Sequence, residues 1–131
     1  MNISQAAAIT GLSAKQIRDY EKVGLLPATA RSGAGYRIYG HSQIERLKFI
    51  ARARQVDFSL VQIRALLALQ DDPNRSSSMV KALTSQHIDE LSQKICQLQQ
   101  MKDTLQQWHD ACHGDARSDC AILRSLAHDK I

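Results

Sequence analysis

The chain has 131 residues and a mass of 14.6 kDa, enough for one domain with an accessory element and too little for a large multidomain enzyme. Hydrophobic residues make up 44%, charged residues 23% and aromatic residues 5%, which excludes disorder throughout the chain and favours helices over a β-sandwich. Residues 1–64 hold 10 of the 17 Lys and Arg but only 4 of the 13 Asp and Glu, so we expect the N-terminal half to bind a polyanion.

Three helix starts are marked by a serine that is followed three residues later by Gln or Glu. In this pattern the serine side chain and the later side chain each cap a free backbone amide. The three pairs are Ser13/Gln16, Ser42/Glu45 and Ser59/Gln62. With the spacing of the apolar residues, they predict helices near residues 4–9, 13–22, 42–54 and 60–69.

The first two predicted helices fit a helix-turn-helix. A small residue can lie where the helices touch, a glycine can take positive φ in the turn, and a branched residue can fill the core; these are Ala7, Gly11 and Ile17. The second helix carries Lys15, Arg18 and Lys22 at spacings of three and four, hence on one face. Such a face can meet phosphates and base edges in a major groove, although an isolated basic run is more often a solvated surface.

Residues 31–39 lie between the second and third predicted helices and favour a small hairpin, or wing. Two glycines permit a tight turn, and the residues after them alternate as in a short strand. Arg31, Tyr36 and Arg37 would form a second basic and aromatic cluster that grips a nucleic-acid backbone, which favours DNA binding over a solvated surface. The candidate DNA-binding residues are Ser13, Lys15, Arg18, Tyr20, Arg31, Tyr36 and Arg37.

The polar, turn-rich residues 70–78 are expected to be a hinge linker. They include Pro73, which cannot continue the hydrogen-bond ladder of a preceding helix. We therefore expect a DNA-binding domain at residues 1–69 and a dimerisation helix at residues 79–110.

The predicted dimerisation helix has one apolar stripe. Its members recur at steps of three and four residues: Ile88, Leu91, Ile95, Leu98, Met101, Leu105 and Trp108. Leu91, Leu98 and Leu105 lie seven residues apart, which is the repeat that lets a second helix pack along the seam as a coiled coil. The pattern predicts a homodimer; the alternative is that the stripe folds back on the chain's own N-terminal domain.

Residues 111–131 are expected to form a metal-binding loop and a C-terminal tail. Seven residues separate Cys112 from Cys120, so both sulfurs can face one ion. Two thiolates are soft donors that select an ion such as Cu(I) over Mg²⁺ or Ca²⁺. Zinc would need four donors, recruited from His109 and His113 or from a partner chain. The alternatives without a metal are two ordinary thiols or a disulfide.

The third cysteine, Cys96, lies beside Ile95 in the predicted helix and is expected to be a small packing residue without a ligand role. The chain begins without a basic signal-like stretch, and charges interrupt every apolar segment, so we expect a cytoplasmic protein that does not contact a membrane. In that reducing compartment, thiols or metal ligands are favoured over a disulfide framework.

Motifs in order along the chain resemble the MerR family of transcription regulators. They are Ile3, the Gly11-Leu12-Ser13 turn, Ile17-Arg18-Asp19-Tyr20-Glu21, Gly24-Leu25-Leu26 and Gly35-Tyr36-Arg37-Ile38-Tyr39. Within the family the chain is similar to the copper-responsive, CueR-like branch, through a linker serine, a long dimer helix and a Cys-x7-Cys loop. Asp19 departs from the family pattern, which usually has an aromatic residue there, and an acid on the recognition helix repels phosphate unless a neighbouring base neutralises it.

The resemblance implies a mainly α protein. A winged helix-turn-helix DNA-binding domain would precede a long antiparallel coiled-coil dimerisation helix and a C-terminal metal-binding loop. The homodimer would bind promoter DNA together with RNA polymerase. When loaded with metal, it would bend and untwist the overlong DNA spacer between the promoter elements that the polymerase uses. An enzyme is disfavoured because the sequence has no Ser-His-Asp set and no phosphate-cradling glycine loop.

For the metal, the resemblance implies that Cys112 and Cys120 hold one Cu(I), or Ag(I) or Au(I), per protomer and that the regulated genes serve copper efflux or detoxification. A zinc or other divalent-metal sensor of the same family is the alternative. Divalent-ion members use another cysteine near the start of the dimer helix, where this chain has Ser76-Ser77-Ser78.

Overall fold

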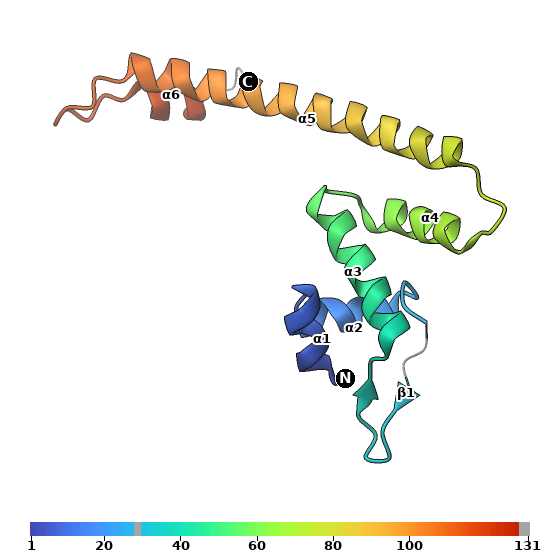
Figure 1. Ribbon diagram of the computed structural model, residues 1–131. Helices are drawn as coiled ribbons and strands as arrows, with labels where there is room; N and C mark the ends of the chain where they lie inside the picture. Colours follow the sequence, from blue (N-terminus) through green and yellow to red (C-terminus); the bar gives the residue numbers. More distant parts are fainter. Residues whose placement is uncertain (28–29, 129–131) are drawn as a thin grey trace. The chain divides into compact units, whose positions relative to one another are not determined.

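The computed structural model describes residues 1–27 and 30–128 of the chain, which divides into two units, Met1–Val80 and Lys81–Ile131. The first unit holds four helices and a two-stranded hairpin (Figure 1). Its elements are α1 (Ile3–Thr10), α2 (Ala14–Lys22), β1 (Ala30–Arg31), β2 (Arg37–Ile38), α3 (His41–Gln55) and α4 (Leu60–Asp71). The long helix α5 (Ser77–Ala111) runs into the second unit, which ends with α6 (Ala121–Ala127).

Two of the three predicted helix starts are confirmed. The Ser13 hydroxyl accepts from the Gln16 amide at 3.0 Å, and the Gln16 side chain accepts from the Ser13 amide at 2.9 Å. The same reciprocal pair, Ser59 with Gln62, begins α4. Because each pair spans one helical turn, local chemistry alone suffices to start these helices.

The third predicted start, Ser42 with Glu45, is wrong. The cap of α3 is Gly40, whose amide donates to the Gln43 side chain at 3.0 Å, so the helix begins at His41 and Ser42 lies inside its first turn. A glutamine two positions earlier than the glutamate serves equally well as the acceptor. An additional cap, Asn2 with Gln5, begins α1.

The turn between α1 and α2 has the predicted glycine geometry. Gly11 has a φ of +76°, and its amide donates to the Ala7 carbonyl at 3.0 Å, which ends α1. Ala6, rather than Ala7, is the fully buried small residue. The core is built mainly from branched aliphatic side chains and two tyrosines: Ala6, Leu12, Ile17, Tyr20, Leu25, Leu26, Tyr39, Ile44, Leu47, Ile50, Ala53, Ile63 and Leu67.

The predicted wing is present as an antiparallel hairpin in which Arg31 pairs with Arg37. Gly35, with a φ of +85°, closes the tip, where its amide donates to the Ser32 carbonyl at 2.9 Å. The Tyr39 amide, just after β2, donates to the Met1 carbonyl at 2.7 Å. The second strand of the wing is therefore attached to the start of the chain.

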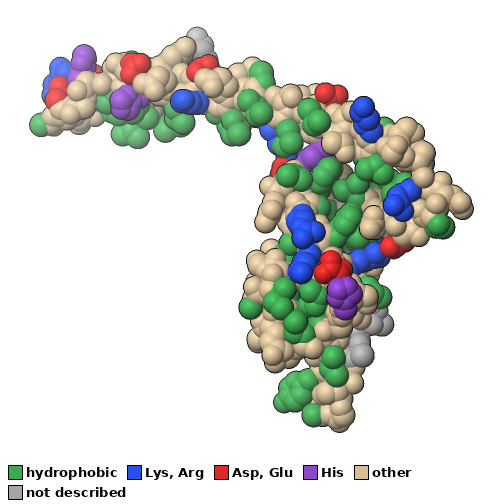
Figure 2. Space-filling model, viewed as in Figure 1, with side chains coloured by type: hydrophobic (Ala, Val, Ile, Leu, Met, Phe, Trp, Pro, Cys, Tyr) green, Lys and Arg blue, Asp and Glu red, His purple; other side chains and the backbone are tan. Residues whose placement is uncertain are grey.

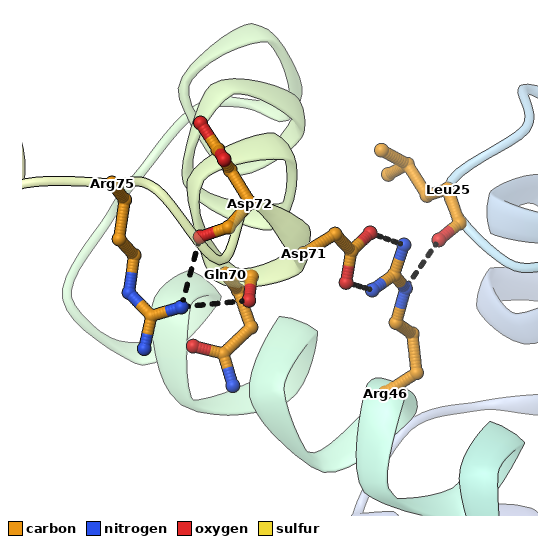
Figure 3. Close-up of polar contacts among 6 residues, drawn as sticks. All are labelled: Leu25, Arg46, Gln70, Asp71, Asp72 and Arg75. Carbon is orange, nitrogen blue, oxygen red and sulfur yellow. Dashed lines mark hydrogen bonds and ion pairs between the residues drawn. The ribbon is translucent and has the colours of Figure 1, made fainter.

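Arg46 ties three segments of the first unit together (Figure 3). From α3, its guanidinium donates to both carboxylate oxygens of Asp71, at 2.7 and 2.8 Å, and its Nε donates to the Leu25 carbonyl at 3.3 Å. The hydrogen bonds from Arg46 hold the pKa of the Asp71 carboxyl below its ordinary value. The end of α4 is thereby attached to α3 and to the segment that follows α2.

The linker between α4 and α5 is shorter than the predicted 70–78, because α4 continues to Asp71 and α5 begins at Ser77. The five residues between the helices form an ordered turn in which the Asn74 amide donates to the Asp72 side chain at 2.9 Å. Arg75 donates to the carbonyls of Gln70 and Asp72 at 3.1 and 3.2 Å, so it caps the end of α4 (Figure 3). Pro73 explains why the helix stops, since the residue before a proline is driven out of the helical region; Asp72 has ψ 112°.

The second unit is dominated by α5, which has 35 residues in all, a length of about 52 Å at 1.5 Å per residue. Hydrophobic side chains lie in a row along this helix (Figure 2). The large exposed ones are Ile88, Ile95, Leu98, Met101 and Leu105. Cys96 is exposed as well, so the packing expected for it is not made within one chain. Within residues 1–27 and 30–128, no helix is both long and apolar enough to cross a membrane.

Candidate DNA-binding face and cysteine pair

Four of the predicted DNA-binding residues gather around one hollow of about 470 Å³ in the first unit. Arg18 comes from α2, and the other three come from the wing: Arg31, Tyr36 and Arg37. The Tyr36 side chain is 74% exposed, and the Arg31 guanidinium donates to the Gly35 carbonyl across the hairpin at 3.1 Å. Residues 13 to 19 positions apart in sequence thus form one basic surface that can meet a polyanion.

The remaining predicted DNA-binding residues, Ser13 at the N-cap of α2 and Lys15 and Tyr20 within it, lie in different environments. Lys15 is exposed. Ser13 is exposed too, and its oxygen already accepts from the Gln16 amide, which leaves the hydroxyl hydrogen for another acceptor. Tyr20 differs from the expectation: it is 5% exposed and belongs to the core, so its ring packs against apolar side chains and offers little surface to DNA.

The structure adds a residue to this face that the sequence patterns did not assign. Glu21 of α2 lies with Oε2 3.1 Å from the Arg37 Nε and accepts from the Tyr39 hydroxyl at 3.3 Å. Burial, and after it the negative charge of Glu21, raises the pKa of the Tyr39 phenol. No local signal announces these contacts, because Glu21 and Tyr39 are 18 positions apart.

The two loop cysteines are brought together in the second unit. Cys112 lies just after α5 and Cys120 just before α6, and their sulfurs are 3.5 Å apart. Both are free thiols, since a disulfide would need a separation of about 2.05 Å. Both side chains are partly buried. The loop between them turns at Gly114, whose φ is +66°. Two metal–sulfur bonds of about 2.3 Å span this gap easily, so one ion can bind both atoms.

The start of α6 favours the thiolate form of Cys120. Hydrogen bonding from the Leu123 amide is the largest cause that lowers the pKa of this thiol, and the Cys112 side chain lowers it further. A thiolate, not a thiol, is the form that binds a metal. The short helix α6 therefore has a chemical consequence for the cysteine pair; the sequence patterns did not predict this helix.

The cysteine pair has few other donors nearby. Among the residues that the structure describes, no group of three or more His, Cys, Asp and Glu side chains is placed to hold a metal ion. His109 is exposed and its Nδ1 lies 3.4 Å from Asp110 Oδ1. At the other end of α5, Ser76 and Ser78 share a hydrogen bond of 2.8 Å between their hydroxyls, with no sulfur in this segment.

Two models of protein families match this chain, and their matches reach into both units. The family model described as MerR HTH family regulatory protein matches residues 1–70, and the model described as MerR, DNA binding matches residues 44–108. The two matches together span the helix-turn-helix, the wing, the linker and most of α5.

Individual relatives are similar over nearly the whole chain. A probable heavy metal-dependent transcriptional regulator from Haemophilus influenzae is 58% identical, with 96% of this chain and 98% of the relative covered. The regulator CueR from Vibrio cholerae is 44% identical, with coverage of 96% and 91%. Among solved structures, the transcription regulator PbrR691 from Ralstonia metallidurans CH34 in complex with lead(II) is 34% identical, with a TM-score of 0.80 and coverage of 96% and 98%.

Proposed function

Because the chain belongs to the MerR family of transcription regulators, we propose that it is a cytoplasmic, Cu(I)-responsive activator of copper efflux or detoxification genes. Two copies of the chain bind one two-fold symmetric operator, each copy placing α2 in a major groove. Cys112 and Cys120 bind one Cu(I) per protomer, and Ag(I) or Au(I) share the softness and charge that these sulfurs prefer.

The observation that carries the choice of metal is the isolated pair of sulfurs. They lie 3.5 Å apart, and the described residues bring no third His, Cys, Asp or Glu to them. Two thiolates satisfy a monovalent soft ion, whereas zinc takes four donors in closed protein sites. CueR from Vibrio cholerae, 44% identical, supports the same choice.

A divalent-metal sensor is the second candidate function. The similarity to PbrR691, whose solved structure contains lead(II), favours it. In that case a further donor would have to come from the partner protomer. The position at the start of α5 where divalent-metal sensors have a third cysteine is occupied here by serines, which argues against this candidate. The two candidates differ in the number and kind of donors around the ion, which is directly measurable.

Activation would proceed through the DNA. An ion held by Cys112 and Cys120 would fix the loop beside the end of α5, and the two DNA-binding domains of the dimer would change their angle through the linker. The operator then bends and untwists, which brings the promoter elements into a register that RNA polymerase can use. The energy for this change is the difference between the contacts that the two protein states make with DNA.

Metal loading under reducing conditions tests the metal. We expect one Cu(I) per protomer, counted by elemental analysis after gel filtration, and two sulfur scatterers per ion in X-ray absorption. The protein loaded with Zn²⁺ serves as the comparison. Retention of zinc in a shell of four donors, together with loss of Cu(I) during gel filtration, would contradict the proposal and support a divalent-metal sensor.

Arg18→Ala tests the DNA-binding face. Removal of this cation from the hollow weakens binding to the operator, and the slope of log K against log salt becomes shallower by about 0.9 if Arg18 neutralises one phosphate. The measurement is a titration by fluorescence anisotropy at several salt concentrations. Arg124→Ala removes the same charge from the exposed surface of α6 and should change the slope little; equal slopes for the two variants would refute the basic-face assignment.

A further inference from the structure

An acidic side chain stands within the basic face of the first unit. Glu21 follows Arg18 by three positions on α2, so the two side chains share one side of the helix. A carboxylate there should repel the phosphates that Arg18 attracts. The contacts of Glu21 suggest a different role, because they lead away from solvent and into the wing.

Glu21 connects α2 to β2 and to the residue that follows this strand, through two contacts on one oxygen. The Arg37 Nε lies 3.1 Å from Oε2, and the Tyr39 hydroxyl donates to the same atom at 3.3 Å. The side chains of Glu21 and Arg37 are only 17% and 33% exposed, so salt screens this ion pair less than an ordinary surface pair. Tyr39 is 1% exposed and therefore a firm anchor.

The wing needs such an attachment. Its two strands contain two residues each, and an isolated two-stranded hairpin is marginally stable in water. The Arg37–Glu21 contact is an ion pair at Nε without a hydrogen bond, so the two Nη groups of the guanidinium remain to be offered to another anion. Glu21 can therefore fix the position of Arg37 without using up its capacity to bind phosphate.

We propose that Glu21 is a positioning residue for DNA recognition: it holds Arg37 of the wing in register with Arg18 of α2, so that both reach the same stretch of DNA backbone. This inference rests on the proposed DNA-binding function and adds to it a residue that touches protein, not DNA. The wing and the recognition helix α2 then keep a fixed relative position on the DNA, and sequence preference depends on the contacts of Glu21 that hold them together.

Glu21→Gln separates this role from simple repulsion of phosphate. If Glu21 positions Arg37, the substitution lowers the affinity for the selected duplex; if Glu21 only repels phosphate, the substitution raises it. The probes are the duplex that the wild-type protein selects from a pool of random sequence, and a scrambled duplex of equal length. Loss of the Glu21–Arg37 ion pair should weaken binding to the selected duplex about fivefold. Binding to the scrambled duplex should tighten about twofold, since one negative charge has left the face.

Asp19→Asn is the matched control. It removes the same charge from the same helix, at an exposed position. It should tighten binding to both duplexes by similar factors and leave their ratio unchanged. Tyr39→Phe removes only the second contact to Glu21, and it should lower the ratio in the same direction as Glu21→Gln but less.

Two further measurements distinguish positioning from loss of folding. The salt slope for the selected duplex should become shallower by about one in Glu21→Gln, because Arg37 no longer meets its phosphate, and thermal melting should show a folded protein at the assay temperature. In an Arg37→Gln background, Glu21→Gln should tighten binding to both duplexes, as Asp19→Asn does.

Equal tightening of both duplexes by Glu21→Gln would overturn the inference, as would fivefold weakening that persists in the Arg37→Gln background. A wild-type protein that selects no sequence from the pool would instead overturn the proposed function itself. The two failures are therefore distinguishable.

Discussion

Cys112→Ser is expected to abolish Cu(I)-induced transcription and to leave the affinity for the operator within about twofold of the wild-type value. A serine oxygen is a hard donor, so the variant keeps only one soft ligand for the ion. The DNA-binding residues all lie in the other unit, Met1–Val80, and keep their contacts. Transcription from an operator-containing promoter in vitro, with and without Cu(I), gives the first quantity, and fluorescence anisotropy gives the second.

Cys96→Ser is the matched control for this experiment. It replaces the third thiol of the chain, which is exposed on α5, and it should retain full induction. Cys120→Ser should behave like Cys112→Ser. If either loop variant lost operator binding, or if induction survived in both, the cysteine pair would not be the sensor.

Leu98→Lys should convert the protein from a dimer to a monomer. Leu98 lies in the middle of the exposed apolar stripe of α5, and its burial in a coiled coil is worth about 1.5–3 kcal/mol for each copy. A two-fold interface buries the residue twice, and the lysine adds the cost of hiding two charges. A monomer grips one half-site only, so affinity for the full operator should fall at least about a hundredfold.

Light scattering after gel filtration measures the oligomeric state, and titration of the full operator measures the affinity. Gln93→Lys adds the same charge five residues away, at an exposed position outside the apolar stripe, and should remain dimeric with unchanged affinity. A monomeric wild-type protein, with a Leu98→Lys variant that merely melts at lower temperature, would favour the alternative in which the stripe packs on the chain's own N-terminal domain.

The sequence was most informative where a structure depends on neighbours in the chain. The capping pairs Ser13/Gln16 and Ser59/Gln62 lie within one helical turn, so pairs of residue types were enough to locate the starts of α2 and α4. The predicted start at Ser42/Glu45 was wrong because a competing local pair exists: the Gln43 side chain accepts from the Gly40 amide, so α3 begins earlier. The two glycines within residues 31–39 likewise predicted a tight turn, and the structure closes it at Gly35.

The candidate site divides in the same way. Residue types and spacing were enough to predict that Arg18 lies on a basic helix face, that a basic wing follows it, and that the Cys-x7-Cys segment forms a loop with two thiols. The burial of Tyr20 could not, because an aromatic residue on a helix can face either the core or the solvent until neighbouring helices pack against it. The seven-residue helix α6 was also missed, since so short a helix depends on its surroundings more than on its own propensity.

By itself, the sequence determined the local pieces of this protein: the starts of α2 and α4, the turn glycines, the basic surface of α2 and the pair of thiols. Only the tertiary structure decided that Glu21 pairs with Arg37, that Arg46 reaches Asp71 25 positions away, and that the sulfurs of Cys112 and Cys120 come within 3.5 Å. The reason is physical: capping and turn geometry follow from bonds within a few residues, whereas a contact between elements depends on how whole helices and strands pack, which no short pattern encodes.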